Sequence, residues 1–377
     1  MLRRTIGLAL AVALMGVVGG CGDDSEGDAG STKVIGESSS QKVRDEATTA
    51  GEKAAGDPVP LKSQTLGILA VNNAAEAVQR MTQGATDAAE ELGWKVNVCD
   101  GAGDPKKMAN CASTLLTQGS TVVASLCVES AGIKPQLEQA KEKGVLWMNY
   151  GCEAAPTPLF ASQITYDEET FGTALGTYVS DELGGEGEVA ATTWSALPSL
   201  KLRADSALKV LEDAGIKVVN VHDTNITTPA EDAQKWTSTV LTRYPDLKAV
   251  VLDSDIEATG AAPALKQKYQ GKSYPDRPMM VAYFGNLANL DLIRKGELDA
   301  AAEIPVEAAG WMTVDRAAQF FARDEAPPEA GAEGYPFDFL KVQVVTKDTL
   351  PSDPKSYVEP DTDFVSFFTA KWGKEFE

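Results

Sequence analysis

The residue types that most often perform catalysis are sparse in this 377-residue sequence. His222 is the only histidine, so a Ser–His–Asp or Cys–His arrangement would depend on that one side chain, and no GxSxG motif is present. Gly271-Lys272-Ser273 matches the end of a phosphate-binding loop, but Lys266 stands where such a loop requires its first glycine. The 55 acidic residues include no pair that the sequence singles out for hydrolysis. These observations predict a protein that is not an enzyme.

The sequence also gives little indication of a metal site or a cofactor site. Asp253-Ser254-Asp255 offers carboxylates to calcium, but neither the glycine nor the distal glutamate of an EF-hand loop follows. The sequence contains no CxxC pair, which together with the single histidine disfavours zinc. We therefore expect no metal and no cofactor.

The N-terminus has the features of an export signal. Arg3 and Arg4 precede an apolar stretch from Ile6 to Val18, which is too short to span a bilayer as a permanent helix. Val18-Gly19-Gly20-Cys21 resembles the lipobox of bacterial lipoproteins, in which the chain is cut before the cysteine and the cysteine is acylated. An ordinary cleaved signal is the alternative. We expect residues 1–20 to be a lipoprotein signal peptide and Cys21 to be the lipid attachment site.

Composition separates a tether from a globular part. Residues 21–62 contain almost no large apolar side chain, which predicts a disordered tether, and the composition becomes globular from about Ser63. The formal net charge of −21 becomes −23 when the signal takes Arg3 and Arg4 with it. Such a surface repels nucleic acid and anionic lipid, so we expect contact with the membrane through the lipid anchor only.

Short apolar runs alternate with helix-like segments over the globular part. The runs form two series, whose midpoints lie roughly 23 to 32 residues apart, and this interval indicates parallel βαβ units. A break around 156–165 separates the series and indicates two sheets. The runs are Leu66–Val71, Lys95–Cys99, Thr121–Val128 and Val145–Tyr150, then Val189–Thr193, Lys217–Val221, Ala249–Asp253 and Met279–Phe284. A return crossing at 298–321 and a last strand at 339–346 are predicted to follow.

Four cysteines remain in the exported chain, and oxidising conditions favour their pairing. Four cysteines allow three connectivities, and four buried free thiols are an alternative. Cys127 and Cys152 end strands that we expect to be neighbours, while Cys99 ends a strand and Cys111 lies on the next helix. We therefore prefer Cys99–Cys111 and Cys127–Cys152.

Several short motifs, taken in order, resemble the type I periplasmic binding proteins. The resemblance covers residues 65 to about 325 and is greatest to the sugar-binding branch that serves ABC importers. The motifs are Leu66–Leu69, Gly84–Gly93, Gly103-Asp104-Pro105, Gln139–Val145, Leu208–Gly215, Tyr244–Val250, Ile293–Leu298 and Pro305–Gly310.

The resemblance implies an α/β fold of two Rossmann-like lobes with parallel sheets, joined by three hinge crossings. The N-terminal lobe would comprise residues 63–160 and 304–330, and the C-terminal lobe and tail would comprise 161–303 and 331–377. In this family the solute sits between the lobes, which close over it because the closed form binds it better.

The resemblance also implies a set of ligand-binding residues near the ends of the strands. They are Asn72, Asn73, Asp100, Glu129, Tyr150, Trp194, Arg203, Asp255, Phe284 and Glu303. The sequence departs from the family where Ala77 and Val78 replace paired aromatics and where Tyr150-Gly151-Cys152 replaces an Asp-Arg pair. These departures count against a simple pentose or hexose and leave open a modified sugar, a polyol or a small aromatic or amino-acid-like solute. Arg203 would favour a carboxylate, a phosphate or a hydroxyl pair, and we expect Arg203→Ala to weaken binding without unfolding the protein.

The sequence therefore predicts a monomeric solute-binding lipoprotein of an ABC importer, on the outer face of the bacterial cytoplasmic membrane. Its partners would be a small polar solute and the permease subunits, with no nucleic acid. A lipoprotein that presents the solute to a membrane signalling receptor is the alternative, and a secreted hydrolase is a third class. A cytoplasmic repressor is disfavoured, because no helix-turn-helix precedes the first strand.

Overall fold

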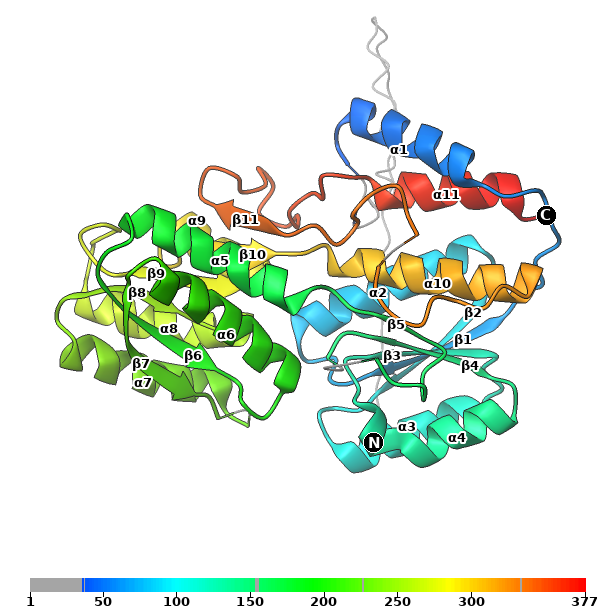
Figure 1. Ribbon diagram of the computed structural model, residues 1–377, viewed down its shortest axis with the longest axis horizontal. Helices are drawn as coiled ribbons and strands as arrows, with labels where there is room; N and C mark the ends of the chain where they lie inside the picture. Colours follow the sequence, from blue (N-terminus) through cyan, green and yellow to red (C-terminus); the bar gives the residue numbers. More distant parts are fainter. Residues whose placement is uncertain (1–35, 37, 153–155, 226, 333) are drawn as a thin grey trace, which may run out of the picture. The chain divides into compact units, whose positions relative to one another are not determined.

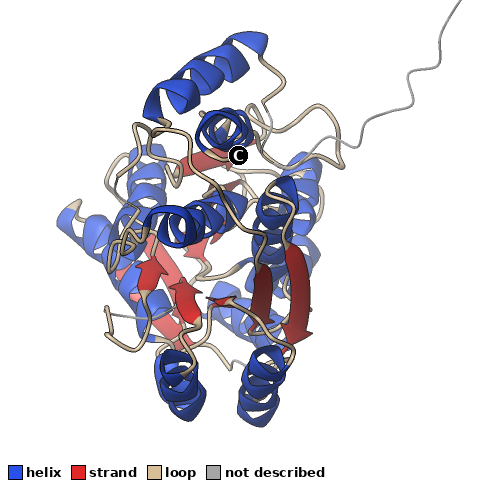
Figure 2. Cartoon of the chain, turned by 90° about the vertical axis from the view of Figure 1, so that its right-hand side faces the viewer, coloured by secondary structure: helices blue, strands red, loops and turns tan. Residues whose placement is uncertain are grey.

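Two β-sheets, each with helices on both faces, form the part of the chain that the structure describes (Figures 1 and 2). The structure is a computed structural model and describes residues 36, 38–152, 156–225, 227–332 and 334–377. The expected signal peptide (1–20) and Cys21 lie outside the described residues. No described helix is both long enough and apolar enough to cross a membrane.

The first sheet is parallel throughout and, with its helices, is here called lobe 1. Its strand order is β2-β1-β3-β4-β5, and along β1 Leu66 and Ile68 face one helical layer while Leu69 faces the other, as the two-residue period of a strand requires. The strands are β1 (Thr65–Ala70), β2 (Lys95–Asp100), β3 (Val122–Leu126), β4 (Leu146–Tyr150) and β5 (Ser162–Ile164). The helices are α2 (Glu76–Glu91) and α10 (Val306–Arg323) on one face, and η1 (Ser130–Ile133), α3 (Pro105–Thr117) and α4 (Lys134–Glu142) on the other.

The second sheet, with its helices, is called lobe 2 and has the order β11-β10-β9-β8-β6-β7, in which only β11 runs antiparallel to its neighbour. The strands are β6 (Glu188–Thr193), β7 (Lys217–Asp223), β8 (Leu247–Val251), β9 (Met279–Tyr283), β10 (Ala300–Glu303) and β11 (Gln343–Thr346). The helices are α5 (Glu168–Leu183) and α6 (Pro198–Asp213) on one face, and α7 (Pro229–Arg243), α8 (Asp255–Lys268) and α9 (Leu287–Lys295) on the other.

The predicted fold class is confirmed, and the eight predicted apolar runs correspond to β1–β4 and β6–β9. Two boundaries differ. Residues 162–164 were assigned to the C-terminal lobe, but as β5 they pair with β4 of lobe 1. Residues 331–377 were also assigned to that lobe, but only β11 joins its sheet. The last helix, α11 (Phe364–Glu375), packs on α10, so the chain crosses between the lobes a fourth time through 347–363.

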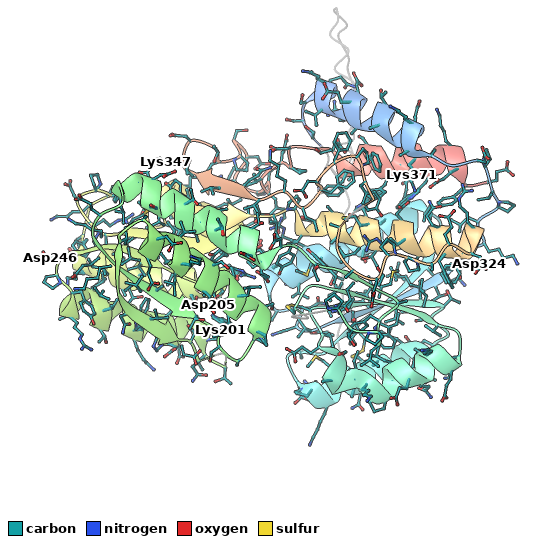
Figure 3. The ribbon with its side chains drawn as sticks, in the orientation of Figure 1. Lys201, Asp205, Asp246, Asp324, Lys347 and Lys371 are labelled. Carbon is teal, nitrogen blue, oxygen red and sulfur yellow. A yellow bond between two sulfur atoms is a disulfide. The ribbon has the colours of Figure 1, made fainter. Side chains whose placement is uncertain are left out.

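Buried ion pairs and aromatic contacts fix α11 on α10. Lys371, labelled in Figure 3, lies 2.6 Å from Asp315 Oδ1 and 2.7 Å from Glu375 Oε1. The Trp372 ring stacks on Trp311 at a centroid distance of 5.4 Å, and its indole N–H donates to Asp315. The C-terminal helix therefore belongs to lobe 1, although the strand before it belongs to lobe 2.

The expectation of disorder throughout residues 21–62 is wrong for Gln41–Ala54, which form helix α1. Figure 1 shows α1 beside α11. Ser40 caps the helix by accepting from the Val43 N–H, and the Ser38 N–H donates to Asp363. The contact face is made of small residues, Ala47 and Gly51, so close packing of two backbones replaces the large apolar side chains whose absence suggested disorder.

A pair of matched glycine substitutions tests the docking of α1. A Cβ at Gly51 would collide with the carbonyl oxygen of Phe367, so Gly51→Ala should weaken docking by about 1–3 kcal/mol. At Gly373, on α11, no described atom lies within 4 Å of the position that a Cβ would take, so Gly373→Ala should instead stabilise the protein by up to about 1 kcal/mol. Limited proteolysis should cut Gly51→Ala faster between residues 38 and 62. Equal resistance of the two variants would contradict the observed contact.

Candidate functional site

The predicted ligand residues cluster where parallel strands end, which is where open α/β sheets bind ligands. Nine of them end a strand or lie within four residues after one, and Arg203 lies on α6. They form two groups. The exposed or half-buried residues are Asn72, Asn73, Asp100, Glu129 and Asp255. The buried residues are Tyr150, Trp194, Arg203, Phe284 and Glu303.

The loops after β1 and β2 are held together by the Asp100 side chain. Its Oδ1 accepts from the backbone N–H groups of Asn73 and Ala102, each at 2.9 Å. Asn72 Oδ1 accepts from the Ala74 N–H at 3.0 Å, which shapes the turn into α2. The Asp100 side chain is exposed and Asn73 is half-buried. This edge of lobe 1 thus presents amide and carboxylate groups that suit hydroxyl hydrogens.

A buried carboxylate organises the corresponding edge of lobe 2. Glu257 accepts from the Trp194 indole N–H at 3.1 Å, the Thr192 hydroxyl at 2.9 Å and the Ser254 N–H at 3.0 Å, and also from the Thr224 hydroxyl. It therefore joins the ends of β6, β7 and β8 and fixes the ring of Trp194. Burial raises the pKa of Glu257, although the donated hydrogen bonds oppose this. The sequence analysis missed Glu257, but Ser254-x-x-Glu257 is the capping-box pattern that could have indicated it.

Arg203, predicted to clamp the ligand, is only 1% exposed and is paired inside lobe 2. Its Nε lies 2.6 Å from Glu168 Oε2 and its Nη2 lies 2.9 Å from Oε1, a bidentate pair. Its Nη1 donates to the Asp253 carbonyl at 3.2 Å. The guanidinium also faces the Phe171 ring at 4.9 Å. The structure thus gives Arg203 a full set of internal contacts that join α5, α6 and the end of β8.

The aromatic residues predicted near the ligand are also buried. Phe284 packs edge-on against Phe171 at 5.4 Å and faces Arg203 at 5.2 Å. Tyr150 is 1% exposed and packs edge-on against Tyr166 at 6.0 Å. These rings therefore form a buried layer beneath the strand ends.

Asp253, two residues after β8, carries a buried carboxylate. It is 1% exposed, and no described side chain donates a hydrogen bond to either oxygen of its carboxylate. Burial raises its pKa well above the ordinary value of 3.8, although the charge of Arg203 opposes this. Because the folded protein then holds the proton more tightly than the unfolded chain, stability falls as the pH rises from about 3.8 through the folded-state pKa.

Asp253→Asn should therefore stabilise the protein at pH 8 by about 1–3 kcal/mol, because burying a charged carboxylate costs more than burying a neutral amide. The amide carries no charge, so the gain should shrink as the pH is lowered toward 4, where the wild-type carboxyl is itself protonated. Thermal melting of both proteins from pH 4 to 8 measures this difference. A gain that is the same at every pH would show that charge burial is not its cause.

Arg80, which the sequence analysis did not identify, connects the two lobes. Its Nη2 lies 2.6 Å from Glu303 Oε1 at the end of β10, and its Nε lies 2.6 Å from Glu307 Oε1 on α10. A Cβ at Gly84 would collide with the Glu307 backbone, so glycine allows α2 and α10 to approach closely enough for this pair. Burial acts to lower the pKa of Arg80, but the two carboxylates raise it well above its ordinary value.

Polar side chains extend this cluster into lobe 2. Arg80 Nη1 donates to Asn286 Oδ1 at 3.1 Å, and Asn286 Nδ2 donates to Asp255. Burial raises the pKa of Asp255, with a smaller contribution in the same direction from Glu76. Glu303 also accepts from the Gly285 N–H, so the hinge residue predicted to touch ligand is held by contacts from both lobes.

Two disulfides lie beside the site in lobe 1 and have the preferred connectivity. Cys99 pairs with Cys111 at a Cα–Cα distance of 5.5 Å, and Cys127 pairs with Cys152 at 4.7 Å. Cys127 and Cys152 follow β3 and β4, so their disulfide ties neighbouring strand ends together. Within the described ranges no three His, Cys, Asp or Glu side chains gather as a metal site. His222 stacks on Trp236 and bonds to Asp232 at 2.7 Å.

Two Rossmann-like lobes, joined at hinges and bearing polar groups at their strand ends, define the class of type I periplasmic binding proteins. The family described as "Periplasmic binding protein domain" matches residues 67–323, and the chain belongs to that family. Its members bind solutes, so the chain is a binding protein rather than an enzyme, as the sequence predicted. No curated protein matches the sequence.

Solved structures share this fold. A periplasmic ribose ABC transporter protein from Conexibacter woesei has a TM-score of 0.67 and 20% identity, covering 78% of this chain and 95% of its own. A 5-methylthioribose transporter solute-binding protein from Thermotoga lettingae has a TM-score of 0.66 and 18% identity, covering 84% and 100%. An ABC transporter solute-binding protein from Agrobacterium vitis with bound allitol has a TM-score of 0.65 and 18% identity, covering 77% and 97%.

Proposed function

We propose that the chain is an extracytoplasmic lipoprotein that binds a sugar, a polyol or a related small polar solute and delivers it to an ABC importer. The observation that supports this proposal is the set of amide and carboxylate groups near the strand ends of the two lobes, on a fold shared with solved structures named for ribose, 5-methylthioribose and allitol. A lipid on Cys21 would hold the monomer at the outer face of the cytoplasmic membrane, near its permease.

The residues proposed to face the solute are the accessible ones together with Trp194. Amide and carboxylate oxygens accept from hydroxyl groups, and the Trp194 face suits the C–H surface of a sugar or polyol. Behind these residues lies a set of buried residues, which we propose hold the solute-facing residues in position. The facing set is Asn72, Asn73, Asp100, Glu129, Trp194 and Asp255; the set behind it is Tyr150, Arg203, Phe284 and Glu303.

Charge at the site favours an uncharged solute. Arg80 and Arg203 are both buried in ion pairs with carboxylates of the chain, so their charge is already compensated. Asp100, Glu129 and Asp255 add negative charge at the accessible edge. A carboxylate or phosphate solute would meet repulsion there, whereas a neutral polyol would find acceptors.

A thermal-shift screen of the full chain against sugars, polyols, amino acids and sugar acids tests the proposal. A solute at 100 times its Kd stabilises the folded state by about 2.7 kcal/mol, which is a clear shift. We expect neutral polyhydroxylated compounds to shift the midpoint and Asn73→Ala to abolish the shift. A response confined to anionic solutes would contradict the assigned chemistry. Incorporation of labelled palmitate, lost in Cys21→Ser, tests the lipid anchor separately.

A further inference from the structure

The fourth crossing brings a residue from outside the matched domain to the junction of the lobes. The family match ends at residue 323, and Tyr357 lies in the segment that returns from β11 to α11. The Tyr357 hydroxyl donates to Glu76 Oε1 at 2.8 Å. The Arg80 guanidinium lies over the Tyr357 ring at 4.5 Å from its centroid. Burial, then the Glu76 carboxylate, raises the pKa of Tyr357, so the hydroxyl keeps its proton and acts as the donor.

Glu76, at the start of α2 in lobe 1, also binds the backbone of lobe 2. Its Oε1 accepts from the Leu287 N–H, the first amide of α9, at 2.9 Å. One carboxylate oxygen therefore receives a hydrogen bond from the C-terminal segment and another from the opposite lobe. A carboxylate at a helix N-terminus is further stabilised by the helix dipole.

The reason that α9 accepts a cap from the other lobe lies in Asn286. This residue occupies the N-cap position, where asparagine is strongly preferred because its side chain can bond the first turn. Its side chain makes no such bond, since Oδ1 accepts from Arg80 and Nδ2 donates to Asp255. The first amide of α9 is therefore satisfied by Glu76 instead.

We propose that Glu76, Arg80 and Tyr357 form a latch that sets the balance between the open and closed arrangements of the lobes, with Tyr357 as a positioning residue contributed by the chain beyond the binding domain. This inference rests on the proposed function, in which closure accompanies binding. If the lobes separate at this junction, the Glu76–Leu287 and Arg80–Asn286 hydrogen bonds break, and the Leu287 amide loses the acceptor that it has in lobe 1. Tyr357 holds the Glu76 carboxylate in place for reclosure and covers Arg80.

Weakening the latch should lower the apparent affinity for solute, because a smaller fraction of the protein would be in the closed form. If only the closed form binds tightly, the apparent Kd is the intrinsic Kd divided by the fraction closed. Loss of one charge-assisted hydrogen bond should then lower the closed-to-open ratio by about tenfold. The latch residues would adjust affinity in this way without contacting the solute.

The test measures the distance between the lobes in the full chain without any solute, so it does not depend on the identity of the ligand. Spin labels are attached through azido side chains at Gln118 and Glu212, exposed positions in lobes 1 and 2, which leaves both disulfides intact. Tyr357→Phe removes the hydroxyl and keeps the ring, Tyr357→Ala removes both, and Glu76→Ala removes the shared acceptor. Tyr244→Phe is the matched control, because Tyr244 donates to the Val219 carbonyl within lobe 2.

We expect the wild type to show a short-distance population that decreases from Tyr357→Phe to Tyr357→Ala and Glu76→Ala, while Tyr244→Phe matches the wild type. Hydrogen exchange at the Leu287 amide should quicken in Glu76→Ala and be rescued in Glu76→Gln, which keeps an acceptor oxygen. Distance distributions that are identical in all variants, or a wild type with no short-distance population, would overturn the latch. Failure of the solute screen would leave this result unaffected, so the two proposals can fail separately.

Discussion

Replacing Arg80 with methionine should lower the free energy of unfolding by about 3–5 kcal/mol, the usual cost of removing one partner from a buried ion pair. Methionine fills a similar volume, so the loss comes from charge. Glu303 and Glu307, with side chains 4% and 2% exposed, would be left facing each other without a counter-ion. Their repulsion and desolvation could be relieved only by protonation or by opening the contact between α2 and α10.

Urea unfolding at pH 7 measures this loss. Lys201→Met is the control, because Lys201 pairs with Asp205 four residues along the exposed surface of α6, where such pairs contribute about 0–1 kcal/mol (Figure 3). Adding Glu303→Gln and Glu307→Gln to Arg80→Met should recover part of the loss, since neutral amides do not repel. If Arg80→Met and Lys201→Met had the same midpoint, the buried cluster would not hold the lobes as the structure indicates.

The fold could be predicted from the sequence because its signal is local. Inner strands, such as Met279–Tyr283, are short continuous apolar runs buried on both faces, and the helices between strands recur at regular intervals. The positions of the site followed from the same pattern, since the carboxyl ends of parallel strands meet at one edge. The choice of Asn73, Asp100 and Asp255 came from the resemblance to the binding-protein family, and the structure places all three at exposed or half-buried positions at or after the ends of β1, β2 and β8.

The contacts of the buried charges could not be predicted in the same way. Arg80 meets Glu303 across 223 residues and Arg203 meets Glu168 across 35, and nothing local distinguishes these arginines from exposed helical ones. Helix α1 was missed for a related reason. Its buried face depends on Gly51 meeting the backbone of α11, a partner more than 300 residues away, whereas composition measures only the apolar surface of the segment itself.

For Arg203, the sequence and the structure predict different effects of the same substitution. The sequence analysis expected Arg203→Ala to weaken solute binding and leave folding intact. The structure instead predicts a loss of stability of about 3–5 kcal/mol, because Glu168 would keep a charge in the interior with no partner. The loss should include the contacts of the guanidinium with the rings of Phe171 and Tyr283.

A double substitution distinguishes the two interpretations. Arg203→Met with Glu168→Gln removes both charges, so it should recover most of the stability lost in Arg203→Ala, measured by urea unfolding. If Arg203 acts only by supporting the strand ends, the recovered double variant should also bind a solute found in the thermal-shift screen. If Arg203→Ala kept the wild-type midpoint but lost binding, the guanidinium would be a direct ligand contact. Because the pair joins α5 to α6 just after the hinge at 165–167, the structure favours the first result: the charges of Arg203 and Glu168 are buried as a pair that fixes α5 and α6 of lobe 2.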